Sequence, residues 1–132
     1  LVDTLPAGSL AVSAGGNAYH YHGGRYYAAR AGGYAVVAPP IGCRIPLLPP
    51  GSTRHWWRNR WYWYHGGCYY NYWDDTDDYE VVEAPVGAIV DELPEGAEKV
   101  VVDGKTYWKV GDTWYRPVYS MGGELKYEVV KL

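Results

Sequence analysis

Apolar and polar positions alternate along most of this chain in short runs that glycine and proline interrupt. The pattern is clearest in residues 99–102, 105–110 and 113–116, short runs rich in Val, Tyr and Trp with the periodicity of β-strands. The pair Asp103-Gly104 separates the first two runs, and both residue types tolerate the positive φ of a two-residue hairpin turn. Gly111-Asp112 provides the next turn. The pattern therefore predicts three consecutive antiparallel strands.

A fourth strand is predicted over residues 124–132, after a glycine-containing loop. Pro117 is expected to end the third strand or to place it at a sheet edge, because proline has no N–H to donate to a ladder. No stretch of ten residues has helical spacing without an interior glycine or proline. We therefore expect almost no helix.

The whole arrangement occurs three times. The motif Leu-Pro-x-Gly stands at residues 5–8, 48–51 and 93–96, a period of about 43–45 residues. Gly15-Gly16 takes the place of the hairpin turn in the first copy, and in the second copy Asn59 replaces the first glycine, since asparagine tolerates the left-handed region. Such a period marks an array of units that share a core.

The repeat boundaries are set at residues 1–47, 48–92 (the aromatic-rich copy) and 93–132. About 40 residues cannot bury enough surface alone, so the copies must pack together into one or two compact units. The predicted fold is all-β, with three tandem antiparallel meanders packed as a sandwich or as small barrels.

Composition narrows the class of protein. There are 15 Tyr and 7 Trp but no Phe, together with 17 Gly and 9 Pro. The net charge of -3 gives no nucleic-acid footprint, so we expect no nucleic-acid partner. No run of 18 apolar residues occurs, so no membrane span is expected.

Cys43 and Cys68 are the two cysteines of the chain, and their spacing fits no CxxC metal or redox motif. We predict a disulfide between them if the protein is exported. The alternative is two separate buried thiols.

The second copy contains aromatic residues that alternate with arginines, from Arg54 to Tyr64. This run could stack sugars or single-stranded nucleic acid. The alternative is a protein interface, because exposed aromatic patches of this size are normally interfaces. The predicted aromatic surface comprises Trp56, Trp57, Trp61, Trp63, Tyr69, Tyr70 and Trp73, with Arg54, Arg58 and Arg60 between them.

Two further clusters could hold a metal. His20 and His22 share a strand face, but His65 is the repeat equivalent of His22, which favours structural turn histidines. The run Asp74 to Asp78 concentrates hard oxygen ligands, yet it lacks the glycine and glutamate of an EF-hand, so a solvated hairpin tip is favoured over a Ca²⁺ site. We therefore predict no metal, no cofactor and no catalytic residues, and a protein that is not an enzyme.

The motifs of residues 36–42 (VVAPPIG), 48–51 (LPPG), 64–70 (YHGGCYY) and 93–117 resemble those of an uncharacterised family of exported bacterial proteins. In that family Y-x-V-V-x-P-P-x-G, L-P-x-G and Tyr-Tyr hairpins alternate. The resemblance covers nearly the whole chain and implies an extracellular or cell-envelope location in a bacterium. The run from Arg54 to Arg60 departs from the family pattern, which has a Val-rich strand and a Gly turn there. The third copy is also similar in style to small bacterial SH3-like barrels.

The chain starts and stops inside its own repeat, which suggests a function. The last copy has its Val-Val strand but no following Leu-Pro strand, and the first copy begins with a Leu-Pro strand. We therefore predict an open sheet edge that the N-terminus of an identical subunit fills, giving a head-to-tail extracellular filament. The predicted interface comprises Leu1, Val2, Leu5, Tyr127, Val129 and Val130. The alternative function is a secreted module that binds glycans or cell wall through its exposed Trp and Tyr.

Overall fold

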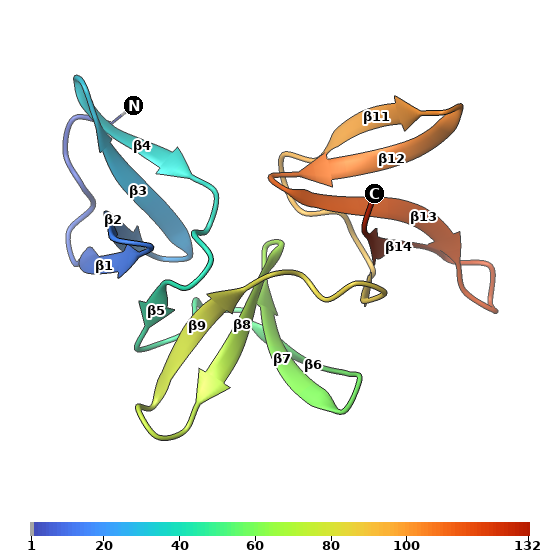
Figure 1. Cartoon of the computed structure of the whole chain (residues 1–132), viewed down its shortest axis with the longest axis horizontal. Helices are drawn as coiled ribbons and strands as arrows, with labels where there is room; N and C mark the ends of the chain where they lie inside the picture. The colour runs from blue at the N-terminus through green and yellow to red at the C-terminus, as the bar shows by residue number, and fades with distance from the viewer. Residues whose placement is uncertain (1) are drawn as a thin grey trace. The chain divides into compact units, whose positions relative to one another are not determined.

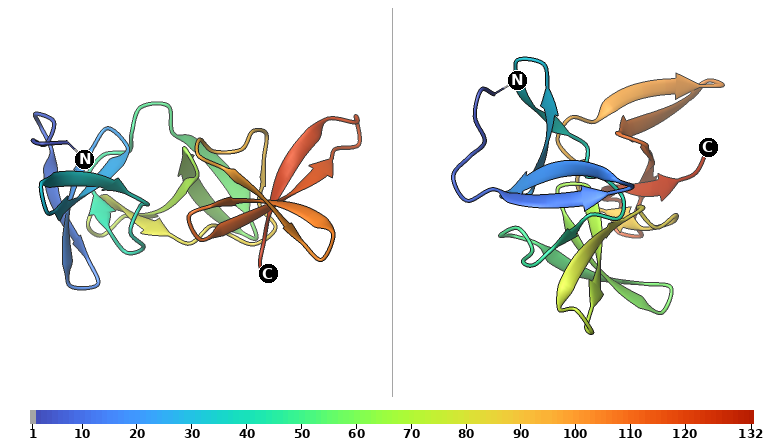
Figure 2. Two further views of the ribbon diagram at one scale, coloured as in Figure 1. Left: turned by 90° about the horizontal axis from the view of Figure 1, so that it is seen from above. Right: turned by 60° about the vertical axis from the view of Figure 1, so that its left-hand side comes forward.

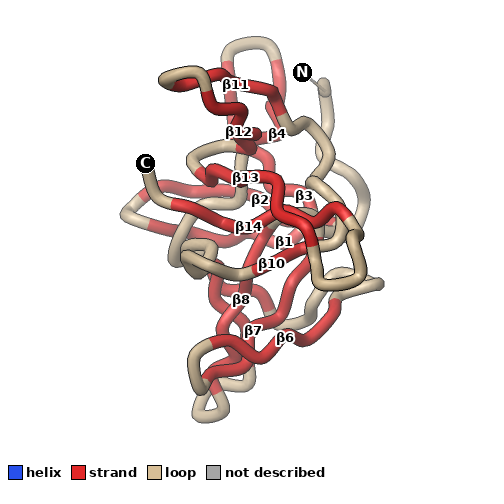
Figure 3. Tube along the Cα trace, turned by 90° about the vertical axis from the view of Figure 1, so that its right-hand side faces the viewer, coloured by secondary structure: helices blue, strands red, loops and turns tan. Residues whose placement is uncertain are grey.

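The computed structural model describes residues 2–132, so Leu1 of the predicted filament interface lies outside the described residues. The described chain is all-β, with 14 strands in three antiparallel sheets and no helix (Figure 3). Each sheet is open and has two edge strands, so none of the three closes into a barrel. No helix within residues 2–132 is long and apolar enough to cross a membrane.

The strands of each sheet follow one another along the chain. The first sheet contains β1 (Leu10–Ala14), β2 (Asn17–His22), β3 (Arg25–Arg30) and β4 (Gly33–Val37). The second contains β5 (Arg44–Ile45), β6 (Thr53–Trp57), β7 (Arg60–His65), β8 (Cys68–Trp73) and β9 (Asp78–Val82). The third contains β10 (Ile89–Val90), β11 (Glu98–Val102), β12 (Lys105–Val110), β13 (Thr113–Tyr119) and β14 (Leu125–Val130).

All three sheets have the same topology. A short segment comes first, a four-strand meander follows, and the short segment pairs antiparallel with the last strand of that meander. The equivalent pairs are Val2 with Tyr34, Ile45 with Tyr79, and Val90 with Tyr127. The Leu-Pro-x-Gly turn lies between the short segment and the meander. The predicted boundaries at residues 47 and 92 therefore cut each later repeat between its short strand and its turn.

The short segment of the second and third sheets begins with a β-bulge. The amide of Gly42 donates to the carbonyl of Val81, and the Val81 amide donates to the carbonyl of Cys43. Gly87 and Ala88 make the same two bonds with Val129. Two residues thus oppose one, and the glycine takes a positive φ of 95° or 93°. This bulge explains the Pro-x-Gly break in the sequence.

These pairings bear directly on the filament hypothesis. The amide of Val2 donates to the Tyr34 carbonyl at 2.9 Å, and the Tyr34 amide donates back at 2.8 Å. The short segment therefore pairs with the meander that follows it, whereas the hypothesis needs it to serve a preceding meander. The edge of β14 is already occupied by β10 of the same chain. The gap inferred from the sequence does not exist, and the filament stays a prediction without that argument.

Each meander consists of two hairpin ribbons that share only a short root. The β6–β7 and β8–β9 ladders each contain five residue pairs, but β7 and β8 pair only from Trp63–Tyr70 to His65–Cys68. Beyond that root the two hairpins diverge (Figure 1). The hairpins of the third sheet diverge in the same way (Figure 2), because β12 and β13 also share three pairs.

This split explains why β13 continues through Pro117: the strand does not end there, and the proline instead lies where one side of the strand is unpaired, the second of the two expected outcomes. Pro117 pairs with Tyr127 on the β14 side. The β12–β13 ladder has already ended at Trp108–Tyr115, so the missing N–H of the proline interrupts no ladder on that side.

The chain divides into two compact units, one ending at Glu83 and the other beginning at Ala84. In the first unit, the first two sheets share a core that is built mainly from tyrosine. Tyr26 of β3 and Tyr70 of β8 are fully buried, and their hydroxyl oxygens share a hydrogen bond of 3.0 Å. In the second unit, Tyr115 and Val129 are buried.

The predicted disulfide is not formed. Cys43 and Cys68 are both buried free thiols of the same core cluster. The segment of Cys43 pairs with β9, and β9 lies between that segment and β8. The two backbones are thus two strand spacings apart, on the order of 10 Å. A disulfide needs Cα atoms within about 7 Å.

Candidate functional site

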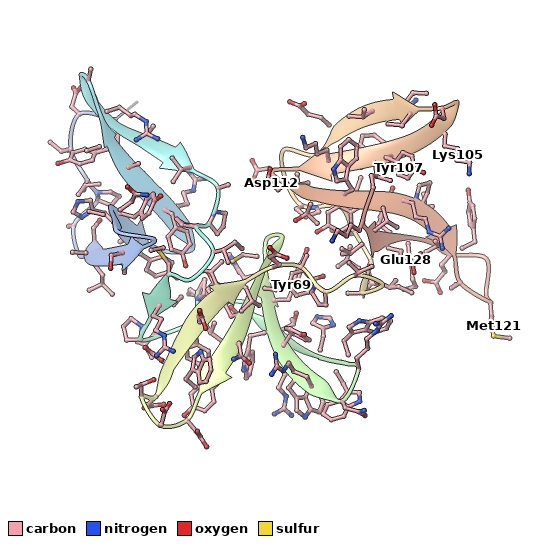
Figure 4. The ribbon with its side chains drawn as sticks, viewed as in Figure 1. Tyr69, Lys105, Tyr107, Asp112, Met121 and Glu128 are labelled. Atoms are coloured by element: carbon pink, nitrogen blue, oxygen red, sulfur yellow. The ribbon has the colours of Figure 1, made fainter. Side chains whose placement is uncertain are left out.

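The most unusual surface of the described chain is the hairpin formed by β6, β7 and their turn, here called the aromatic ribbon (residues 53–65). Five cross-strand pairs hold it together, and it extends past the three-pair root that joins it to β8. Side chains cover both faces of this ribbon (Figure 4). Because strand side chains alternate, Arg54, Trp56, Trp61 and Trp63 share one face.

The centre of that face is an indole pair. Trp56 and Trp61 are directly opposite each other, and their ring centroids lie 5.1 Å apart in an edge-to-face arrangement. Trp56 is 53% exposed and Trp61 is 46% exposed. Large aromatic side chains at this exposure are unusual for a packing role and typical of a surface that contacts a ligand or a partner.

The repeat itself shows that the fold does not need these indoles. The equivalent cross-strand pair is Ser13–Ala18 in the first sheet and Val101–Thr106 in the third. The same hairpin thus forms with small or β-branched residues at both positions. The two tryptophans are therefore specific to the second sheet, and the repeat fold does not require them.

Arg54 completes this face. Its guanidinium carbon lies 4.1 Å from the ring centroid of Trp61 and 5.9 Å from that of Trp63. Stacking of this kind holds a cation over an aromatic face while leaving its N–H groups directed outward to acceptors. The face therefore combines flat apolar surface with oriented hydrogen-bond donors.

The turn of the ribbon is strained. Arg58 has a φ of 49° and Asn59 a φ of 65°, so both lie in the left-handed region. Arg58 occupies the place of Gly15 and Asp103, and Asn59 that of the second glycine, Gly16, which corrects the alignment made from the sequence. An ordinary side chain in this region costs about 1–2 kcal/mol.

Charged residues are distributed unevenly along the chain, which the net charge of -3 does not show because it sums over all residues. No Asp or Glu occurs between Asp3 and Asp74. Within residues 2–132, the ion pairs are those of Arg44 with Asp78, Arg116 with Glu128, and Lys126 with Asp91. The arginines of the aromatic ribbon therefore have no carboxylate partner in the described chain.

The other residues of the predicted aromatic surface have different environments. Tyr70 is in the core, and Tyr69 is buried at the root of the β7–β8 pairing, where Figure 4 labels it. Tyr69 packs against Tyr64 with ring centroids 4.8 Å apart. Trp73 lies on β8 and donates from Nε1 to Glu80 at 2.8 Å. The predicted surface thus divides into the buried Tyr69 and Tyr70, the ribbon tryptophans, and Trp73, which is exposed on β8 outside the ribbon.

The aspartate run forms the turn between β8 and β9. Asp77 accepts a hydrogen bond from the Tyr72 hydroxyl at 2.7 Å, and Asp78 accepts one from Thr76 at 2.6 Å. Asp78 also pairs with Arg44. Among the described residues, no group of three or more potential ligands converges on a metal position.

The histidines occupy packing positions. The rings of His20 and Tyr34 lie edge to face at 5.8 Å, and His65 packs closely against Gly24. His22 lines a pocket of about 210 Å³ in the first unit, together with Tyr21, Leu47 and neighbouring prolines. This pocket brings no acid and base pair together, so the aromatic ribbon remains the stronger candidate site.

Comparison with known proteins places the chain in one family. A family of unknown function, DUF6515, matches residues 1–132. The chain belongs to DUF6515. It matches no curated protein and no solved structure significantly.

Membership of DUF6515 confirms the resemblance to an uncharacterised family over the whole chain. The repeat motifs assigned to that family, and its export, stay predictions. The function of this DUF6515 chain therefore has to be argued from the geometry of its second sheet.

Proposed function

We propose that this protein is a non-enzymatic binding module that attaches to glycans of the bacterial cell envelope or its surroundings through the aromatic ribbon. The observation that carries the proposal is the exposed pair of Trp56 and Trp61, at positions where the other two sheets have small or β-branched residues. Indole rings stack on the apolar C–H faces of pyranose sugars. The stacked Arg54 supplies donors for sugar hydroxyls beside them.

The rest of the structure supports a rigid platform. The ribbon is fixed at its root by the β7–β8 pairs, and the root is backed by the core of Tyr26 and Tyr70. Binding surfaces on regular strands are held more firmly than those on loops.

The test replaces Trp56 by Ser and Trp61 by Ala, the residues that the first sheet uses. Binding to insoluble cell-wall polysaccharides and to soluble oligosaccharides is measured by pull-down and by calorimetry. We expect the double variant to fold and to bind at least about tenfold more weakly, since each ring contact contributes on the order of 1 kcal/mol.

Tyr119→Ser is the matched control, because Tyr119 is also an exposed aromatic residue but lies outside the ribbon. It should bind as the wild type does. Wild-type protein that binds no polysaccharide, or a double variant that binds normally, would overturn the proposal.

A further inference from the structure

The glycan partner can be defined further, and this inference rests on the proposed function. We propose that the aromatic ribbon recognises an acidic polysaccharide, one whose sugars carry carboxylate or sulfate groups, with Arg58 and Arg60 at the turn as the anion-binding residues. Three observations carry it: the unpaired arginines, the strained turn, and the spacing of the charges along the ribbon.

The first observation is the lack of internal partners. Arg54, Arg58 and Arg60 lie within one hairpin, and the ion pairs of residues 2–132 all involve other cations. Arg58 contacts the ring of Trp57, with its guanidinium carbon 5.8 Å from the ring centroid. The guanidinium N–H groups of these arginines are therefore free to donate to the oxygens of an external carboxylate or sulfate in a bidentate geometry.

The second observation is the backbone at the turn. The first and third sheets place Gly15 and Asp103 where the ribbon has Arg58, and both residue types suit a positive φ. Arg58 adopts a φ of 49° at a cost in stability. Strained positions of this kind are concentrated at functional sites, where the side chain is needed for something besides folding.

The third observation concerns the kind of polyanion. The neighbouring β8–β9 turn carries Asp74, Asp75 and Asp77, so within the second sheet the positive area of the ribbon borders a negative turn. Arg54 lies on β6 and Arg58 in the turn that follows it, so the two are four residues apart in sequence and at most about 14 Å apart. Arg54 shares the face of Trp56 and Trp61, whereas Arg60 pairs with Trp57 on the opposite face, so a ligand that reaches both arginines must pass the turn. Charges spaced in this way match a sugar chain with isolated acidic groups. Nucleic acid carries a negative charge at every nucleotide, a denser spacing than that of the arginines. Its phosphates would also be repelled by the aspartates of the β8–β9 turn.

The test compares three probes at low salt: a galacturonate hexamer, a neutral β-glucan hexamer, and a thymidylate hexamer. We expect the galacturonate to bind at least tenfold more tightly than the neutral hexamer. The preference should shrink at 0.5 M NaCl, where charges are screened over a few ångströms. Equal affinities for the charged and neutral sugars would overturn the inference and leave the proposed function standing.

The decisive variant is Arg58→Gly with Arg60→Asn, which places at these two positions the residues that the first sheet has there, Gly15 and Asn17. It should lose the preference for galacturonate, keep its affinity for the neutral hexamer, and have a denaturation midpoint equal to or above that of the wild type. Arg30→Asn, at an exposed arginine of β3, is the control and should change neither affinity.

Three further results would count against the inference. If the Arg58→Gly, Arg60→Asn variant still prefers galacturonate to the neutral hexamer, Arg58 and Arg60 do not bind the acidic groups. Binding of thymidylate more tightly than either sugar would replace the polysaccharide by single-stranded nucleic acid. Failure of the wild type to bind either sugar would remove the inference together with the proposed function.

Discussion

The hydroxyl groups of Tyr26 and Tyr70 share a buried hydrogen bond of 3.0 Å that joins the first sheet to the second. The Tyr70 hydroxyl also bonds the Cys68 thiol, so Tyr70→Phe is the change that leaves a hydroxyl, that of Tyr26, unpaired in the core. We expect Tyr26→Phe or Tyr70→Phe to lower the free energy of unfolding by about 1–3 kcal/mol. The double variant should lose less than the sum of the two, as a double-mutant cycle by denaturant unfolding can measure. Additive losses would mean that the two groups do not interact.

Alkaline pH should destabilise the first unit. Burial raises the pKa of Tyr26 and Tyr70 above the ordinary tyrosine value of 10.0, and it raises the pKa of Cys68 to about 12. The folded state therefore holds these protons more tightly than the unfolded state does. The stabilisation is complete below about pH 9 and is lost as the pH rises further, by about 1.4 kcal/mol per pH unit for each group.

Denaturant midpoints between pH 7 and pH 11 test this dependence. The variant with phenylalanine at both Tyr26 and Tyr70 should show a shallower decline, because two of the groups no longer ionise on unfolding. A midpoint that stays constant to pH 11 would contradict the burial of these groups.

The two cysteines should behave as buried thiols. Burial raises the pKa of both Cys43 and Cys68, and the thiolate is the reactive form. We expect Ellman's reagent to react slowly with the native protein at pH 8 and to titrate two thiols rapidly in 6 M guanidinium. Protein purified without reductant that shows no thiol in guanidinium would instead restore the predicted disulfide.

Gly33 controls the pairing of the N-terminal segment. A Cβ atom at Gly33 would lie 2.3 Å from the carbonyl oxygen of Val2, and the glycine has a φ of 148°. Gly33→Ala should break both Val2–Tyr34 hydrogen bonds and cost about 2 kcal/mol. Hydrogen exchange at the Tyr34 amide should accelerate. Gly122→Ala, at a site with ordinary φ and free space, is the control and should leave that exchange unchanged.

Sedimentation addresses the filament prediction. Since Val2 pairs within its own chain and β10 occupies the edge of β14, we expect a monodisperse protein at micromolar concentration. Removing residues 1–5 should destabilise the first sheet, but the oligomeric state measured by sedimentation should not change. Polymers that disappear on this deletion would support the filament and require the N-terminal segment to exchange between copies.

Much of the fold could be predicted because it is encoded locally. The turns at Asp103-Gly104 and Gly111-Asp112 need residues that tolerate unusual φ, and each lies between two strands as expected. The sequence left open whether Pro117 ends β13 or lies at an unpaired edge, because the outcome depends on where the β12–β13 ladder ends, which is a property of the sheet.

The direction of the short strands could not be read from the sequence. Ile89-Val90 follows one Val-Val strand and precedes the next meander, so its sequence position fits either partner. The structure pairs it with β14, more than 35 residues later. The same long-range pairing separates Cys43 from Cys68, so the disulfide prediction failed for the same reason.

The candidate site was recognised in part. The alternation of tryptophan and arginine identified the aromatic ribbon, but Tyr69 and Tyr70 were grouped with it although they are buried. The first half of β8 is buried on both faces, so its sequence does not alternate between apolar and polar residues and gives no sign of which side chains are exposed. The strain at Arg58 was missed, yet comparison with Gly15 and Asp103 in the sequence could have revealed it.

The narrow root between paired hairpins has a consequence for how such a chain can evolve. Within each meander, three residue pairs connect the first hairpin to the second. Sequence changes near the turn of a hairpin therefore need not disturb the hydrophobic core. Duplication of the unit then gives one copy the freedom to acquire a new surface while its siblings preserve the scaffold. The tryptophans of the middle copy occupy the positions that serine, alanine, valine and threonine have in the other two copies, which is the result expected from such divergence.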